Sequence, residues 1–103
     1  MFDNLKRRRL NLLWCGLHAS TAAGVFELGV NVARAAGYEE VYGEPDYMDV
    51  LAYDIERLEH SDRAIVQATH NHYYGLQNIR LYKLTAIGRQ MLIDEGFVLD
   101  SQW

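Results

Sequence analysis

The chain has 103 residues, half of them hydrophobic, and a formal charge of −4. This length fits one domain with a single core and excludes two domains of ordinary size. The hydrophobic content and the single proline exclude a disordered chain, and the negative charge argues against binding nucleic acid through bulk positive potential. We therefore expect one folded domain over residues 1–103.

The charges are unevenly distributed along the chain. Four basic residues stand together near the amino terminus, namely Lys6, Arg7, Arg8 and Arg9. Residues 39 to 62 hold many carboxylates against the single base Arg57, and these are Glu39, Glu40, Glu44, Asp46, Asp49, Asp54, Glu56, Glu59 and Asp62. The pattern predicts a molecule with a basic end and an acidic flank.

Cys15 is the only cysteine, so no disulfide can form within the chain. Its apolar neighbours indicate a thiol that serves packing in a reducing compartment, because nothing nearby in the sequence would lower its pKa. The longest apolar run, "LLWCGL", is far shorter than the roughly 18–20 residues that cross a bilayer. We expect a cytoplasmic protein that does not contact membranes.

Apolar residues at helical spacing predict two helices in the first third of the chain. The first covers residues 3–17, and the second runs from about residue 21 to 36, with Ser20 as its cap and Gly37 as its stop. The stripe of the second helix consists of Val25, Leu28, Val32 and Ala35.

The segment "YEEVYGEP" is the longest polar connection, and its Pro45 suits entry to a third helix from Asp46 to about His60. The apolar stripe of this helix is Tyr47, Leu51, Ile55 and Leu58, at spacings typical of a helix that is buried on one face. Its opposite face shows Asp49, Tyr53, Glu56 and His60, with Asp46 at the start.

The period then changes to that of strands. "RAIVQAT" and "IRLYKL" are short and rich in β-branched or aromatic residues, and they flank the loop "HNHYYGLQN". Thr85 can cap a last helix from Ala86 to about Asp94, which Gly96 ends. The expected fold class is α+β, mainly α, with three helices, a two-stranded hairpin and a short C-terminal helix.

This order, together with the stretch "LYKLTAIGRQML", resembles winged helix-turn-helix regulator families. The strand closes in a Tyr-x-Leu-Thr pattern and runs into a helix of the form Gly-Arg-x-x-Leu; the matching residues are Tyr82, Leu84, Thr85, Gly88, Arg89 and Leu92. In physical terms Leu84 anchors the strand, Thr85 caps the helix and Gly88 allows close packing. "VFELGVNVARAAGY" is similar to the helix before a recognition helix, and "DVLAYDIERLEHSDRAIV" to a recognition helix leading into the wing.

The resemblance implies a transcriptional regulator that binds double-stranded DNA, commonly as a homodimer on two half-sites. The third helix departs from this pattern, because Asp46, Tyr47, Met48 and Asp49 stand where groove-reading side chains would be. Phosphate or minor-groove contacts would then fall to Lys6, Arg7, Arg8, Arg9, Arg34, His70, Asn71, His72, Gln77, Asn78 and Arg80. A basic run at a helix start can equally be a solvated feature.

A second hypothesis is a protein-interaction module that keeps the winged-helix frame and binds a basic protein partner instead of DNA. Its surface would consist of Tyr42, Asp46, Tyr47, Asp49, Tyr53 and Glu56. Aromatic residues are enriched in interface cores, and carboxylates around them would attract a basic protein. The alternative is that the tyrosines only pack the polar connection onto the domain.

An enzyme is not expected. His70 and His72 would point the same way on a strand and could bind a metal, but no third ligand is evident beyond His60 or Asp62. We therefore predict no catalytic residue, metal or cofactor. Phe97 and Trp103 in the tail are either dimer contacts or packed on their own domain.

Overall fold

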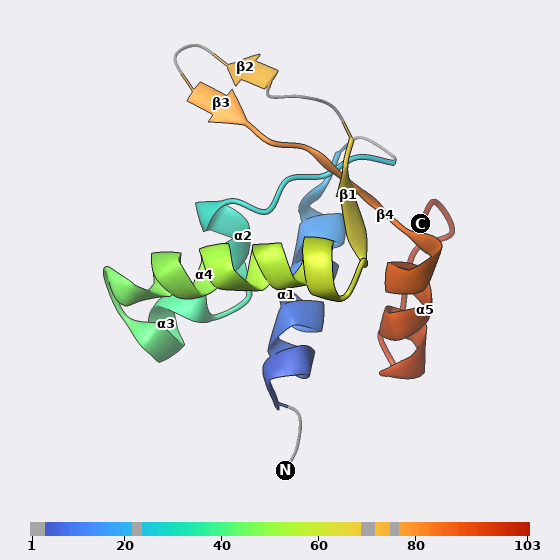
Figure 1. Ribbon diagram of the computed structural model, residues 1–103, viewed down its shortest axis with the longest axis horizontal. Coiled ribbons are helices and arrows are strands. Elements are labelled where there is room, and N and C mark those ends of the chain that lie inside the picture. The colour runs from blue at the N-terminus through green and yellow to red at the C-terminus, as the bar shows by residue number, and fades with distance from the viewer. Residues whose placement is uncertain (1–3, 22–23, 69–71, 75–76) are drawn as a thin grey trace.

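The fold is α+β and mainly helical (Figure 1). The computed structural model describes residues 4–21, 24–68, 72–74 and 77–103, with the backbone alone for 72–74 and 77–79. Its helices are α1 (Asn4–Ala19), α2 (Val30–Ala35), α3 (Tyr38–Tyr42), α4 (Asp46–Glu56), the π-helical turn η1 (Arg57–Ser61) and α5 (Ala86–Asp94). Its strands are β1 (Ile65–Gln67), β2 (His72–Tyr74), β3 (Gln77–Ile79) and β4 (Tyr82–Leu84).

Helix α1 passes through the middle of the domain, behind α4 in Figure 1. Its leucines Leu10, Leu12, Leu13 and Leu17 are all buried, so α1 is covered on more than one side. The predicted helix over residues 3–17 is confirmed in substance and extends to Ala19. In the part of the chain that the structure describes, no helix combines the length and the apolar character that a membrane span needs.

The predicted second helix is wrong over residues 24–29, which form no helix; α2 begins only at Val30. Residues 22 and 23 of the predicted range lie outside the described residues. Phe26 exchanges backbone hydrogen bonds with Tyr82, at 3.0 and 2.8 Å, so its backbone lies beside β4 as a short third strand. The predicted stripe included Val25 and Leu28, but the buried residues are Phe26 and Leu28 with Glu27 exposed between them, which is the period-2 alternation of an extended segment.

The predicted polar connection after Gly37 contains helix α3. Tyr38 is buried in the core, and Glu39 and Glu40 stand in the first turn, where carboxylates favour helix formation. Gly37 has a φ of +87°, which lets the chain turn from α2 into α3. One buried tyrosine thus anchors a five-residue helix that the charged sequence concealed.

The predicted third helix is confirmed as α4 followed by η1. Tyr47, Leu51 and Leu58 are buried and Ile55 is half-buried, while Asp46, Asp49, Tyr53, Glu56 and His60 are exposed. The π-helical turn ends with the Asp62 amide donating to the Arg57 carbonyl oxygen at 2.8 Å. The turn after η1 sends the chain into β1.

The two predicted strands pair antiparallel as β1 and β4, with Ile65 opposite Leu84, Val66 opposite Lys83 and Gln67 opposite Tyr82. The segment between them is not only a loop, because β2 and β3 also pair antiparallel, with His72 opposite Ile79. The hairpin therefore extends away from the helices as an arm, at the top of Figure 1. Within this segment residues 69–71 and 75–76 lie outside the described residues.

Helix α5 begins as the sequence predicts. The Thr85 hydroxyl accepts from the Gly88 amide at 3.0 Å and donates to the Arg63 carbonyl oxygen at 2.6 Å, so it caps α5 and ties it to the start of the hairpin. Leu92 is fully buried, and Leu84 packs against the core. Gly96 has a φ of +87° and ends the helix.

Candidate functional site

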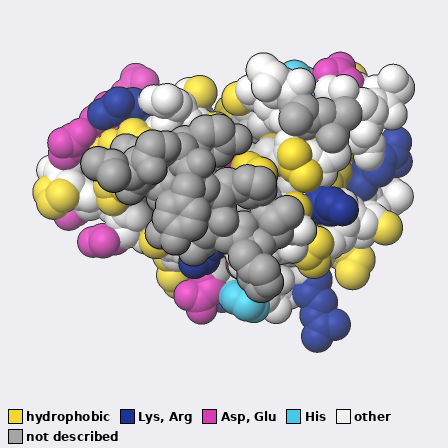
Figure 2. Space-filling view, turned by 90° about the horizontal axis from the view of Figure 1, so that it is seen from above, with side chains coloured by type: hydrophobic (Ala, Val, Ile, Leu, Met, Phe, Trp, Pro, Cys, Tyr) yellow, Lys and Arg dark blue, Asp and Glu magenta, His cyan; other side chains and the backbone are white. Residues whose placement is uncertain are grey.

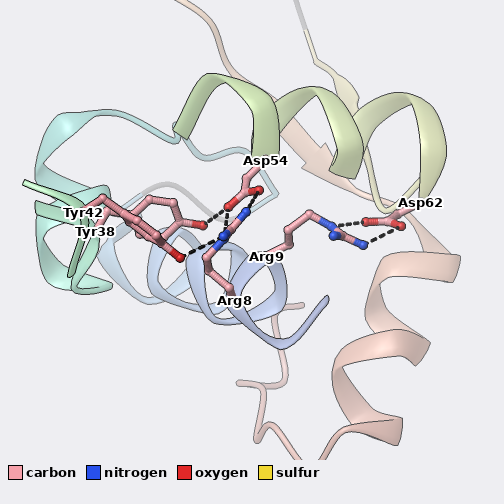
Figure 3. Close-up of polar contacts among 6 residues, drawn as sticks. All are labelled: Arg8, Arg9, Tyr38, Tyr42, Asp54 and Asp62. Carbon is pink, nitrogen blue, oxygen red and sulfur yellow. Dashed lines mark hydrogen bonds and ion pairs between the residues drawn. The ribbon is translucent and has the colours of Figure 1, made fainter. Parts of the chain in front are cut away.

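Two arginines of α1 bind the α4–η1 helix from below (Figure 3). Arg8 makes a two-pronged contact with Asp54, from Nε to Oδ2 at 2.7 Å and from Nη2 to Oδ1 at 2.6 Å. Arg9 does the same with Asp62, at 3.0 and 3.3 Å. Asp54 is completely buried, and the Arg9 side chain is 7% exposed. The two ion pairs hold α1 against α4 and the end of η1, at points about two helical turns apart.

Two tyrosines of α3 complete the polar cluster around Asp54. The Tyr38 hydroxyl donates to Asp54 Oδ2, and Arg8 Nη1 donates to the Tyr42 hydroxyl oxygen at 2.8 Å. Arg8 also lies over the Tyr42 ring, 5.3 Å from its centroid. Bidentate arginine–carboxylate pairs with further hydrogen bonds are the geometry in which a buried charge is tolerated. The cluster therefore joins α1, α3 and α4.

The interpretation of Arg8 and Arg9 as surface cations is corrected by these contacts. Their guanidinium groups are turned into the domain and each makes two hydrogen bonds to a carboxylate, so these charges are already paired within the molecule. Arg7 is exposed; it donates to the Glu95 carbonyl oxygen at 2.9 Å and lies over the Phe97 ring at 4.8 Å. Lys6 is half-buried and also interacts within the molecule. The basic run thus serves in part to hold the fold together.

The cluster affects proton binding. Burial and the hydrogen bond to Asp54 raise the pKa of Tyr38 well above its usual value, while the neighbouring Arg8 lowers it to a lesser degree. The hydrogen bond to Asp54 in turn raises the pKa of Arg8. Both shifts keep the cluster in the protonation state in which its hydrogen bonds form.

We expect stability to fall above about pH 10, where an unfolded tyrosine ionises but folded Tyr38 keeps its proton. Below that pH the contribution of Tyr38 is fully present. A Tyr38→Phe variant should be less stable at neutral pH and should lose stability less steeply with pH, by about 1.4 kcal/mol per pH unit. Urea denaturation at several alkaline pH values measures this slope. A variant that keeps the wild-type slope would contradict the assignment.

The outward side of α4 is acidic and carries one exposed aromatic side chain. We call it the acidic face and define it as Asp46, Asp49, Tyr53 and Glu56, which share one side of the helix. Tyr53 is 53% exposed, and Arg57 lies over its ring at 5.8 Å. Seen from above, Asp and Glu gather toward the end of the molecule where α3 and the start of α4 lie (Figure 2).

Two residues of the predicted protein-interaction surface do not lie on it. Tyr47 is 3% exposed and belongs to the core. Tyr42 is half-buried and engaged by Arg8. The alternative that these tyrosines pack their segment onto the domain is correct for both. Asp46, Asp49, Tyr53 and Glu56 remain available to a partner.

A second surface of opposite charge lies at the base of the hairpin. Residues 63 to 93 contain no Asp or Glu, and their bases Arg63, Arg80, Lys83 and Arg89 are all exposed. Val66 and Lys83 are directly opposite in the β1–β4 ladder, so they share one face, the outward one. Arg63 adjoins the start of α5 through the Thr85 hydroxyl, and Ile87 follows there with 53% exposure.

We call this surface the basic surface and define it as Arg63, Val66, Lys83 and Ile87. Arg63 is the one described residue other than glycine that has a positive φ, +54°. It stands where the chain leaves η1, a position at which glycine is the usual residue. The left-handed conformation costs a non-glycine residue about 1–2 kcal/mol. A charged side chain is therefore present at a position where the backbone conformation favours glycine.

Comparison with protein-family models, curated proteins and solved structures gives no significant match to this chain. Its own residues thus supply the argument for its function.

Arg80 lies apart from the basic surface. It lines an open hollow of about 280 Å³ together with residues of α4 and η1, namely Ala52, Ile55, Glu56, Glu59 and His60. Two carboxylates thus stand near Arg80, which reduces the positive potential it offers to a phosphate. His70 and Asn71 lie outside the described residues, and for His72, Gln77 and Asn78 the structure gives only their positions in β2 and β3.

The structure brings together no metal site among the residues it describes, where no group of three His, Cys, Asp or Glu side chains is suitably placed. Asp62, a possible third ligand for the hairpin histidines, is bonded to Arg9. Cys15 is half-buried against the core, and this burial raises the pKa of its thiol.

The two aromatic residues of the tail pack on their own domain. Trp14 donates to the Val98 carbonyl oxygen at 2.9 Å, and its ring lies 6.0 Å from that of Phe97. The Trp103 ring meets the Phe26 ring edge-on at 5.8 Å. Of the two sequence-based alternatives for Phe97 and Trp103, the structure favours internal packing over dimer contacts.

Sequence reasoning missed Arg63 and Lys83 as candidate surface residues. The signal that could have found them is the absence of acidic residues between positions 63 and 93, next to a strongly acidic segment. It also missed the partners of Arg8 and Arg9. No local pattern marks Asp54 and Asp62, because ion pairs that are distant in sequence depend on how the helices pack.

Proposed function

We propose that the protein is a small winged-helix DNA-binding protein of the transcriptional-regulator type, which contacts duplex DNA through the base of its hairpin. Support for the winged-helix part comes from the order of elements. A helix that is buried on one face leads into an antiparallel hairpin, which returns into a capped short helix. The backbone of Phe26 pairs with β4 on the side away from β1.

The charge distribution carries the DNA-binding part of the proposal. Phosphate contacts depend on lysine and arginine side chains that reach the duplex without opposing carboxylates. The basic surface offers Arg63 and Lys83, and Arg89 is exposed on α5 close by in the sequence. The acidic face of α4 would repel a phosphate-lined groove. We therefore assign the contact to the hairpin side, which departs from the usual use of the third helix for groove reading.

The conformation of Arg63 supports a role for its charge. Backbone strain at a residue that could be glycine suggests a function that is maintained at the expense of stability. An arginine there projects a cation at the junction of η1, β1 and α5. The Arg63 side chain is exposed, so burial does not account for its presence.

An Arg63→Gly substitution should therefore separate stability from binding. We expect the free energy of unfolding to rise by about 0.5–1 kcal/mol, because glycine adopts the left-handed conformation without strain. The midpoint of urea denaturation should rise accordingly. We also expect weaker binding to a short mixed-sequence duplex in a low-salt gel-shift assay. The dependence of log K on log salt should become shallower by about one unit.

Lys83→Gln should weaken binding in the same way without a gain in stability. The matched control is Arg34→Gln, which also removes an exposed cation. The sequence made Arg34 a candidate phosphate contact, but in the structure it lies in α2 and pairs with Glu39 at 3.2 Å and with Glu44 at 3.8 Å, so it is not part of the proposed contact. This control should bind the duplex as the wild type does. Absence of any shift by the wild-type protein, or equal binding by all three variants, would refute the proposal.

A second candidate function is the protein-interaction module. It is favoured by the exposure of Tyr53 between Asp49 and Glu56 on the acidic face. An exposed aromatic side chain within a charged patch is typical of protein interfaces. Failure of the gel shift, together with a basic protein whose binding is lost on charge reversal at Asp46 and Asp49, would favour this function.

A further inference from the structure

The acidic face and the basic surface have opposite charges and a similar make-up. The acidic face sets Tyr53 among carboxylates, and the basic surface sets Val66 and Ile87 beside Arg63 and Lys83 in the chain. Val66 is 47% exposed and Ile87 is 53% exposed, which is similar to the 53% exposure of Tyr53 on the acidic face. Each surface therefore has the composition of half an interface, with apolar side chains that can be dehydrated and charges that set orientation.

The acidic face and the basic surface do not contact each other within one molecule. Val66 and Lys83 project from the outward face of the β1–β4 ladder, whereas Ile65 and Leu84 occupy the face that packs on the domain. The acidic face likewise projects from α4, away from its buried stripe. Two rigid outward faces of one domain remain apart, so a contact between them requires two molecules.

We infer that the acidic face of α4 binds the basic surface of a second copy of this chain. Every solution of the protein contains further copies of the chain. A second copy supplies the complementary charges, so no other protein is needed. Opposite charges would orient the two copies as they approach, and burial of Tyr53, Val66 and Ile87 would sustain the contact at salt concentrations that screen exposed charges. The interface differs from a tail-mediated dimer, because Phe97 and Trp103 pack internally.

Charge exchange tests the contact directly. One variant carries Asp49→Lys and Glu56→Lys, which makes the α4 face basic. The other carries Arg63→Glu and Lys83→Glu, which makes the hairpin surface acidic. Each variant alone opposes like charges at the interface, whereas a mixture of the two restores opposite charges at every contact between unlike chains.

Sedimentation velocity without nucleic acid gives the readout. We expect the wild-type protein to associate at micromolar concentration and low salt, each variant alone to be monomeric, and an equimolar mixture to associate again. Circular dichroism confirms that the variants are folded. Neutral versions, with Asp49→Asn and Glu56→Gln, should weaken association without abolishing it.

Several results would overturn the inference. A wild-type protein that stays monomeric at all concentrations tested would do so, as would variants that associate like the wild type or a mixture that does not recover. A monomeric wild type that binds polylysine through the acidic face would also overturn it and assign the face to another basic partner. Because the assay contains no DNA, its outcome is separate from that of the gel shift.

Discussion

Substitution of Asp54 by asparagine should cost about 3–5 kcal/mol of folding free energy, the effect expected when one partner of a buried ion pair is removed. The side chain keeps its size, but the Arg8 guanidinium loses its counter-ion and Tyr38 loses a charged acceptor. A domain of this length has a total stability of about 5–15 kcal/mol, so the loss is a large part of it. Urea denaturation followed by circular dichroism measures the change.

Two comparisons isolate the cause. Arg34→Gln breaks an ion pair with Glu39 whose side chains are 50% and 37% exposed, and it should leave the unfolding midpoint almost unchanged. Combining Asp54→Leu with Arg8→Met removes both charges and should recover part of the stability lost by Asp54→Asn, because no unpaired charge stays buried. If Asp54→Asn unfolds at the wild-type midpoint, the cluster does not hold α4 in place.

The second half of the chain was largely predictable from its sequence. The change from helical spacing to short β-branched runs marks β1 and β4, and the pattern around Thr85 and Gly88 fixes the start of α5. These signals are local, because a cap and its amide are three residues apart. The pairing of β1 with β4 then follows from the short distance along the chain and the turn residues between them.

The first half was less predictable, because tertiary contacts decide its local structure. Residues 25–29 have an apolar spacing that fits a helix. The Phe26 amide and carbonyl groups nevertheless form their hydrogen bonds with Tyr82 of β4, 56 positions away. Gly16 of α1 allows this approach, since a Cβ there would lie 2.6 Å from the Leu28 side chain. No pattern in a single sequence encodes such a contact.

The candidate site was predicted only in part. The exposed face of α4 was derived correctly from periodicity, since Asp46, Asp49, Tyr53 and Glu56 are all exposed. The role of the basic run was not, because charge alone does not distinguish an exposed arginine from one that pairs with a buried carboxylate. Tyr47 illustrates the same limit. Its position on the apolar stripe predicted a core residue, whereas its aromatic ring suggested an interface residue.

The two proposals share residues and therefore constrain each other. Arg63 and Lys83 would contact phosphates in one and the acidic face of a second copy in the other. Duplex DNA and self-association would then compete for the same surface, with the carboxylates of α4 taking the place of phosphates. The acidic face of α4 is unfavourable for contact with a DNA groove, but in this arrangement it binds the basic surface of a second copy.

A methyl group added at Gly88 should be among the most damaging single changes in the chain. An ideal Cβ at this position would overlap the carbonyl oxygen of Ala64 and lie 2.9 Å from its carbonyl carbon and its Cα. These are backbone atoms of the segment that enters β1, so they cannot move aside as the end of a side chain can. The approach is fixed from both sides, since the Thr85 amide donates to the same Ala64 carbonyl oxygen at 3.0 Å.

We therefore expect Gly88→Ala to destabilise the fold by about 3 kcal/mol, at the upper end of the usual cost of overpacking, although alanine is the better helix former. Gly29→Ala is the matched control, because a Cβ there meets nothing within 4 Å and the φ of −106° suits any residue. The control changes only the N-cap of α2 and should shift the melting temperature far less than Gly88→Ala, which lowers it and weakens duplex binding by displacing Arg63 from α5. Equal melting temperatures for the two variants would show that α5 does not pack on Ala64 as closely as this geometry requires.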